Sequence, residues 1–286
     1  MNLSTGINPI VMGIRHFEIL KAGYCTSNQS IALHKAESKT IRFPASVSLL
    51  EHDKNGLILF DTGYAGHFFR ASKRLPYSIY PMITPVYFKP EEAIKHQLAQ
   101  KGISHKDIRT VIISHFHGDH IGGLKDFPNA KFICHDSAFQ SIENKKGFRA
   151  LMKGFLPDLI PANFRSRLKL LKDSDCYIYQ NLKTWDLFDD ESIILQRLDG
   201  HADGQLGMRI KYKANCFFLV ADAAWLWQNY KQLWFPSPRV KLFFSSWSQY
   251  KNNLQKLHQI HTHTQSEIIP THCEQTIERI KKEYHV

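Results

Sequence analysis

VIISHFHGDHIGG, residues 111–123, places three histidines and an aspartate directly after an apolar run. Residues two apart in an extended segment point the same way, so His115 and His117 can address one point from the end of a strand. Asp119 and His120 follow the turn at Gly118 and can address a second point nearby. Imidazole and carboxylate are ligands that zinc accepts. The spacing therefore predicts a metal site at a strand end rather than a chance group of surface histidines.

This cluster cannot complete two metal positions by itself, and three further candidates follow predicted strands. His201 comes after SIILQRL, Asp222 ends NCFFLVAD, and His272 follows SEIIPT. An ionised carboxylate at the end of an apolar run is costly unless it is paired or bound to a cation. Because loops at one edge of a sandwich converge in space, we expect these three side chains to meet the first cluster.

Strands and helices alternate in both halves of the chain. Hydrophobic patterning predicts strands over 11–20, 45–52, 56–63, 108–114, 129–135, 192–201, 206–213, 215–222 and 266–270, and helices over 90–102, 136–146, 245–263 and 274–283. Asp53-Lys54-Asn55-Gly56 is a hairpin turn signal between the second and third strands. The order indicates an α/β protein built as an αββα sandwich, with two mixed β-sheets and helices on the outer faces, in a single domain over 1–286.

Residues 145–190 differ from the rest of the chain. They mix Lys and Arg with Phe, Leu and Met, and two prolines interrupt them. We expect a basic, mostly helical insertion in this range. For its most basic part, 145–172, a solvated surface helix is the simpler interpretation, and contact with a membrane or with nucleic acid is the alternative.

Charge and cysteine usage limit the class of protein. The 286 residues carry a formal net charge of +11, which attracts anions or serves only solubility. The five cysteines are odd in number, widely spaced and without a CxxC pair, which is typical of a reducing compartment. We find no signal peptide and no apolar run of the roughly 18 residues that a membrane helix needs. These features predict a cytoplasmic protein without a transmembrane segment.

The candidate ligands, taken in chain order, resemble a known family. His115-Phe116-His117-Gly118-Asp119-His120, Gly200-His201, Asp222 and His272 together are similar to the signature of the metallo-β-lactamase-fold hydrolase superfamily. Asp61-Thr62-Gly63 resembles the early Asp-Thr-Gly turn of that family. The resemblance covers most of the chain, from residue 40 onward, and it is specific for the superfamily but not for a substrate.

The resemblance implies an enzyme with two divalent metal ions. Zn²⁺ is the expected metal, and Fe, Mn or Co are alternatives that the same ligands accept. His115, His117 and His201 would hold the first ion; Asp119, His120 and His272 would hold the second; and Asp222 would bridge the two. A hydroxide shared by the ions would attack a carbonyl or phosphorus, and Asp119 would also shuttle a proton, which makes Asp119 and Asp222 the expected catalytic residues. Asp61 is not expected to bind metal. It is expected either to contact the metal ligands from behind or to be an ordinary turn residue.

Two residues narrow the choice among the branches of this superfamily. His117 stands where the oxygen-reducing di-iron members carry glutamate, which favours hydrolysis, and Asp222 stands where the antibiotic-degrading branch carries cysteine. The size and the full ligand set are most similar to the quorum-quenching N-acyl homoserine lactonases. The expected partner is a small-molecule substrate that bears an acyl chain or is anionic, with Phe116 and Trp225 as candidate substrate contacts. The lactonases place a tyrosine at the position of Trp225, whose indole donates a hydrogen bond but is no acid.

Other functions stay open at this stage. A phosphodiesterase or nuclease would suit the basic composition, although nucleic acid is not favoured, and a glyoxalase II-like thioesterase would use the same metal site. A third hypothesis is a non-catalytic metal-binding interaction protein. A homodimer is also left open.

Overall fold

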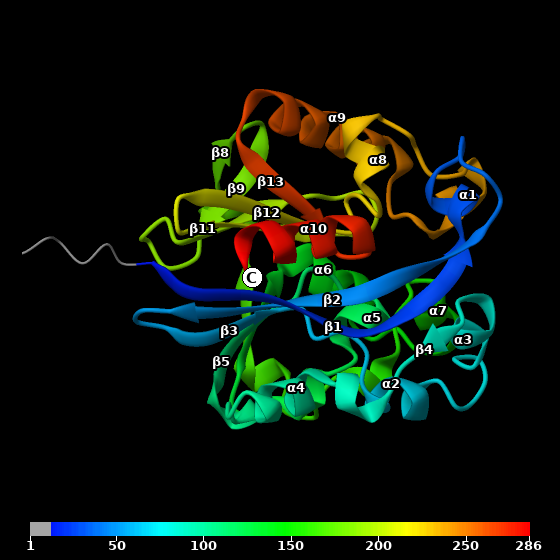
Figure 1. The fold of residues 1–286 in the computed structure, drawn as a ribbon. Coiled ribbons are helices and arrows are strands. Elements are labelled where there is room, and N and C mark those ends of the chain that lie inside the picture. The colour runs from blue at the N-terminus through cyan, green and yellow to red at the C-terminus, as the bar shows by residue number, and fades with distance from the viewer. Residues whose placement is uncertain (1–12) are drawn as a thin grey trace, which may run out of the picture.

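The computed structural model describes residues 13–286, and the first two residues of the predicted strand at 11–20 lie outside this range. Two β-sheets lie between helices, as Figure 1 shows, and this arrangement confirms the predicted αββα sandwich. The strand order is β4-β1-β2-β3-β5-β6-β7 in the first sheet and β13-β12-β11-β10-β9-β8 in the second. Both sheets are mixed, since β3, β5, β6 and β7 run parallel and β12 pairs in parallel with β13.

The strands are β1 (Ile14–Asn28), β2 (Thr40–His52), β3 (Gly56–Phe60), β4 (Val86–Tyr87), β5 (Ile108–Ile112), β6 (Lys131–His135), β7 (Leu168–Leu171), β8 (Tyr177–Tyr179), β9 (Leu182–Asp186), β10 (Ile193–Arg197), β11 (Leu206–Tyr212), β12 (Asn215–Ala221) and β13 (Ser266–Pro270). The helices are α1 (Gln29–Ala32), α2 (Gly66–Ala71), α3 (Ile79–Ile83), α4 (Ile94–Gln100), α5 (Gly118–Ile121), α6 (Asp136–Ile142), α7 (Gly147–Leu151), α8 (Trp227–Lys231), α9 (Trp247–His263) and α10 (Glu274–Tyr284). Short 3₁₀ turns span Pro90–Glu92, His105–Asp107, Leu124–Asp126, Pro157–Leu159, Arg165–Arg167, Asp173–Asp175 and Pro238–Phe243.

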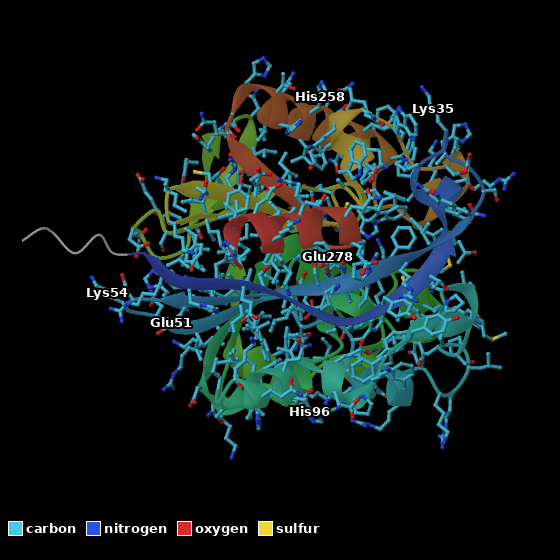
Figure 2. The ribbon with its side chains drawn as sticks, viewed as in Figure 1. Lys35, Glu51, Lys54, His96, His258 and Glu278 are labelled. Atoms are coloured by element: carbon cyan, nitrogen blue, oxygen red, sulfur yellow. The ribbon has the colours of Figure 1, made fainter. Side chains whose placement is uncertain are left out.

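Alternation along the strands builds three apolar layers. On β1, Phe17 and Ile19 face the layer between the two sheets, whereas Leu20 and Ala22 face the layer on the outer side of the first sheet. The third layer lies under α8 and α9 on the outer side of the second sheet. Successive side chains of a strand point to opposite faces, so one strand contributes to two layers. Side chains fill these layers throughout the molecule (Figure 2).

The hairpin predicted at residues 53–56 is present. Strands β2 and β3 pair antiparallel, with His52 opposite Gly56, and Gly56 has a φ of 69°. Glycine adopts this left-handed conformation without steric cost. The hairpin sets β3 beside β5, and β5 leads directly into the histidine motif.

The prediction of a mostly helical segment at 145–190 is wrong. This range contains one five-residue helix, α7, and then short 3₁₀ turns and the strands β7, β8 and β9. Pro157 and Pro161 remove backbone donors and prevent a longer helix. Leu168–Leu171 instead pairs in parallel with β6, so contacts distant in sequence decide the conformation here.

Within residues 13–286, no helix combines the length and the apolar character needed to cross a membrane.

Candidate metal centre

Seven side chains from the ends of four strands come together at one edge of the sandwich. The ligand atoms of one group lie within 4.8 Å of one another, as do those of a second group. The first group is His115, His117, His201 and Asp222, and the second is Asp119, His120 and His272. The motif follows β5, and the other three residues follow β10, β12 and β13, so both sheets contribute.

Asp222 lies between the two groups. Its Oδ2 is 3.2 Å from Nε2 of His201, and its Oδ1 is 3.1 Å from Nε2 of both His120 and His272. One carboxylate therefore faces both groups. A carboxylate between two dications also reduces their mutual repulsion.

Hydrogen bonds behind the cluster orient three of the imidazole rings. Nδ1 of His120 donates to Oδ2 of Asp61 at 2.7 Å, and Nδ1 of His272 donates to the carbonyl oxygen of Pro44 at 2.8 Å. Nδ1 of His115 lies 3.0 Å from Oγ of Ser114, which in turn donates to Asp61. Each bond fixes the proton on Nδ1 and leaves Nε2 free as a ligand atom.

The donor set fits metal ions. Nε2 of His115, Nε2 of His120 and Oδ1 of Asp222 are buried, and none of them has a partner with hydrogen-bond geometry among the described residues. Buried polar atoms without partners are rare, because each loses its solvation. In addition, Nδ1 of His117 faces Nε2 of His201 at 3.0 Å, which suits two ligands of one ion. Nitrogen and oxygen donors of this kind match zinc.

Burial and neighbouring charge divide the histidines into two kinds. Burial lowers the pKa of His117 to about 4 and holds the pKa of His115 and His201 well below the usual range. These three rings are neutral at pH 7 and need lose no proton to bind a metal. Burial also lowers the pKa of His120 and His272, but the carboxylates beside them outweigh it and raise both values. Burial raises the pKa of Asp222, and its histidine neighbours reverse this and hold the value well below the usual range.

Trp225, expected as a substrate contact, uses its polar atom inside the protein. Its Nε1 donates to Oδ2 of Asp222 at 2.9 Å, and its ring lies edge-on to His201 and tilted against Phe244. The indole therefore holds the carboxylate that the two groups share. The spacing of three residues between Asp222 and Trp225 was the only sequence signal for this contact.

Tyr80 is a site residue that the sequence did not reveal. Its hydroxyl donates to Oδ1 of Asp119 at 3.4 Å, while Oδ2 of Asp119 lies 3.4 Å from Nε2 of His272. Burial, with Asp119 adding to it, raises the pKa of Tyr80 well above its usual value, so the hydroxyl keeps its proton. Tyr80 lies on α3, far from the motif in sequence, and no local pattern marks it.

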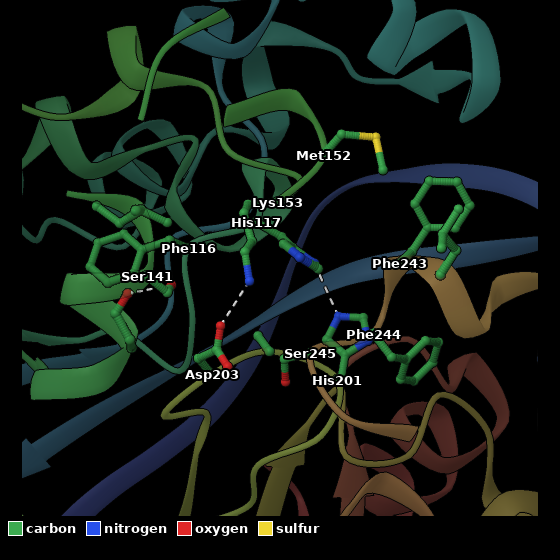
Figure 3. A pocket seen from close by; sticks show the side chains of 14 residues that line it. Phe116, His117, Ser141, Met152, Lys153, His201, Asp203, Phe243, Phe244 and Ser245 are labelled. Carbon is green, nitrogen blue, oxygen red and sulfur yellow. Dashed lines mark hydrogen bonds and ion pairs between the residues drawn. The ribbon is translucent and has the colours of Figure 1, made fainter. Parts of the chain in front are cut away.

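A cavity of about 220 Å³ opens beside His117 and His201 (Figure 3). Phe116 lines it, but its ring packs mainly among Phe139, Phe155 and Phe164. At its polar side, Nζ of Lys153 donates to Asp203 at 2.9 Å, as Figure 3 shows. Apart from Phe116 and the two histidines, the cavity is lined by Ala138, Ser141, Ile142, Met152, Lys153, Ala202, Asp203, Leu242, Phe243, Phe244 and Ser245.

The backbone is constrained where it meets the site. Asp61 and Ala221 have φ values of 63° and 46°, in a region that non-glycine residues seldom occupy. Ala221 directly precedes Asp222, so the strained residue aims the shared carboxylate. Gly154 has a φ of 60°, and a Cβ there would lie 2.5 Å from the His117 ring. Such positions cluster at functional sites.

Comparison with known proteins finds relatives in sequence and in fold. N-acyl homoserine lactonase AiiB from Agrobacterium fabrum is 27% identical over 203 residues, which are 68% of this chain and 67% of that protein. A variant of AiiA from B. thuringiensis with N-decanoyl-L-homoserine bound superposes with a TM-score of 0.73 at 18% identity, covering 94% of this chain and 97% of the other. AidC, a dizinc quorum-quenching lactonase, gives a TM-score of 0.62 at 17% identity, covering 92% of each chain.

The family model of the metallo-beta-lactamase superfamily matches residues 40–272. This range contains all seven residues of the two ligand groups. The chain belongs to the metallo-beta-lactamase superfamily.

Proposed function

We propose that this protein is a dinuclear metal-dependent hydrolase that opens a lactone or another ester, with N-acyl homoserine lactones as the substrate class. The observation that carries the proposal is the pair of ligand groups that share Asp222. A single metal position would need neither the second group nor a carboxylate between them. The similarity to AiiB supports the choice of a lactone.

In this proposal, Zn²⁺ is the metal at both positions, and Fe, Mn and Co are the alternatives that such ligands accept. His115, His117 and His201 would hold one ion, Asp119, His120 and His272 would hold the other, and Asp222, which faces both groups, would be available to both. When bound, such ions polarise a carbonyl oxygen and lower the pKa of water.

The chain's own residues supply the proton handling and the orientation. Asp119 is 9% exposed at the cluster, and its carboxylate can take a proton from the attacking water and return it to the leaving alcohol oxygen. The Tyr80 hydroxyl donates to Oδ1 of Asp119, which keeps that carboxylate turned toward the site. The Trp225 indole holds Asp222 by one oxygen. The lactonases have a tyrosine at the position of Trp225. In this chain, the hydroxyl at the cluster comes from Tyr80 instead.

The cavity beside His117 supports a substrate with an acyl chain. Ile142, Met152 and Phe244 give it apolar walls, and His117 and His201 of the metal centre also line it. An ester carbonyl at the metal centre would leave an attached alkyl chain in contact with these walls. Apolar walls with few polar groups are typical of small-molecule sites.

The basic character of the chain keeps phosphodiesters as the second candidate, since a positive field attracts anionic substrates. Decanoyl homoserine lactone and bis-p-nitrophenyl phosphate, offered separately to the zinc-loaded protein, distinguish the two. We expect the lactone to open with proton release in a pH-stat and the phosphodiester to react far more slowly. The Asp222→Ala variant is the control for adventitious hydrolysis. Rapid release of p-nitrophenol with a flat lactone trace would contradict the proposal.

A further inference from the structure

Large apolar side chains stand exposed on two segments that line the cavity and on a third segment beside them. Leu242 is 78% exposed, Met82 76% and Phe148 65%. We call the whole set the mouth rim, and it comprises Leu75, Met82, Ile83, Phe148, Met152, Leu242 and Phe243. Exposed apolar residues in a contiguous group mark surfaces that bind a partner.

Contacts at the site bring the segments of the mouth rim together. Met152 and Phe243 line the same cavity and face one another across it in Figure 3. The backbone N–H of Gly147, at the start of α7, donates to the hydroxyl of Tyr77 at 2.8 Å. This bond joins α7 to the segment that leads into α3, which lies next to α7 in Figure 1. Residues from 147–153 and 238–243 therefore line the cavity, and the bond to Tyr77 places residues 72–84 beside the first of these segments.

The chain around the mouth rim is free of carboxylates. No Asp or Glu occurs between Asp61 and Glu91, between Glu143 and Asp158, or between Asp222 and Glu267. Exposed basic side chains accompany the apolar ones in each segment, namely Lys73, Arg74, Lys146, Arg149, Arg239 and Lys241. Asp203 is the acidic residue among those that line the cavity, and its carboxylate is paired with Lys153. The face thus combines protruding apolar groups with unopposed positive charge.

We propose that the mouth rim docks on the surface of an anionic phospholipid membrane. Its apolar side chains enter the boundary between headgroups and acyl chains, and its basic side chains lie at the lipid phosphates. Nucleic acid would use the positive charge but leave Leu242 and Met82 in water. A second copy of the chain would bring two positive faces together, which is unfavourable. Of these three occupants, only the anionic lipid surface satisfies both features.

Docking has a consequence for access to the site, which rests on the function proposed above. Met152, Leu242 and Phe243 of the mouth rim line the cavity, so a docked molecule would receive acyl-bearing substrates from the bilayer, where they partition. Binding itself requires neither metal nor turnover. A binding measurement therefore tests the docking independently of the hydrolase proposal.

The test is flotation of the full-length protein with vesicles of phosphatidylcholine and phosphatidylglycerol, compared with phosphatidylcholine alone. Ile83→Ser with Phe148→Ser should lower the vesicle-bound to free ratio by at least about tenfold, because two large apolar groups no longer insert. Arg74→Gln with Arg149→Gln should lower it by about fivefold per charge, and raised salt should weaken parent binding in the same way. None of these four residues lines the cavity or contacts the metal centre.

Two matched controls lie elsewhere on the surface. Ile178 on β8 is 65% exposed, like Phe148, and Ile178→Ser should leave binding unchanged. Lys54 lies at the turn between β2 and β3, at the left of Figure 2, whereas α3 and α7 lie at the right of the same view in Figure 1, and Lys54→Gln should also have little effect.

Four results would overturn the proposal. One is the absence of binding to anionic vesicles at low salt. Another is an equal loss of binding in the mouth-rim and control variants. The third is a concentration-dependent dimer, detected by sedimentation velocity, that the Ile83→Ser and Phe148→Ser changes dissolve, because the rim would then be an interface between copies. Binding to a DNA duplex that depends on Arg149 but not on Phe148 would likewise favour nucleic acid over lipid.

Discussion

Replacing Asp61 with asparagine should weaken one metal position far more than the other. Asp61 is 1% exposed and accepts three short hydrogen bonds, from the backbone N–H of Ser114, from its hydroxyl, and from Nδ1 of His120. Asparagine keeps one acceptor oxygen but places an amide donor where the second oxygen was. If that donor faces His120, the ring must give up its bond or move its proton to Nε2, the atom that would bind metal.

The size of the effect follows from these contacts. A buried hydrogen bond to a charged group contributes about 1.5–3 kcal/mol. At about 1.4 kcal/mol per factor of ten, this corresponds to roughly 10- to 100-fold in affinity, the range found for partners that orient metal ligands. The loss should fall on the position formed by Asp119, His120 and His272, because Asp61 contacts a ring of that group directly.

Competition titration against a chromogenic zinc chelator measures both dissociation constants. Asp126→Asn is the matched control, because Asp126 is also buried and hydrogen-bonded, to His67 and Lys95, but does not touch the cluster. It should lower stability and leave both zinc affinities near those of the parent. The reasoning is refuted if Asp61→Asn binds both ions as tightly as the parent, or if it weakens both positions equally.

Three further changes test other contacts. Trp225→Phe removes the donor to Asp222 and should lower kcat for the lactone about tenfold while the melting temperature changes little; an unchanged kcat would contradict the orienting role. Gly154→Ala places a methyl group against His117 at a left-handed φ, so it should cost about 1–2 kcal/mol in urea unfolding and also weaken zinc binding, and parent-like binding would count against the close packing. Burial raises the pKa of Asp126, but bonds from His67 and Lys95 outweigh it and lower the value. The stabilisation should be complete above about pH 4 and fade as pH falls further, so the stability gap between parent and Asp126→Asn should narrow there; a constant gap would disprove the linkage.

The sequence predicts most of the fold because local patterns and chain order agree. The turn at Asp53–Gly56 and the apolar run before His115 have local signatures, and the structure contains both the hairpin and the strand. The candidate ligands could be selected because each follows a strand, and strand ends meet at one edge of a sandwich. Proline and charge patterns could not reveal β7, because Leu168–Leu171 is extended only through its pairing with β6.

The parts of the site that escaped prediction depend on contacts between distant segments. Tyr80 reaches Asp119 from α3, and Pro44 supplies a carbonyl oxygen to His272 from β2. Neither residue type marks a metal site by itself. Trp225 was singled out as a departure from the lactonase pattern, but its hydrogen bond to Asp222 required the geometry of the turn after β12.

The number of metal ions per chain tests the central claim most directly. The purified protein is saturated with zinc, freed of unbound metal and analysed by inductively coupled plasma mass spectrometry, with Asp222→Ala beside it. The two groups that share Asp222 predict two zinc ions per chain in the parent and a loss of tightly bound zinc in the variant. One ion or none in the loaded parent, or two retained without Asp222, would contradict the dinuclear centre.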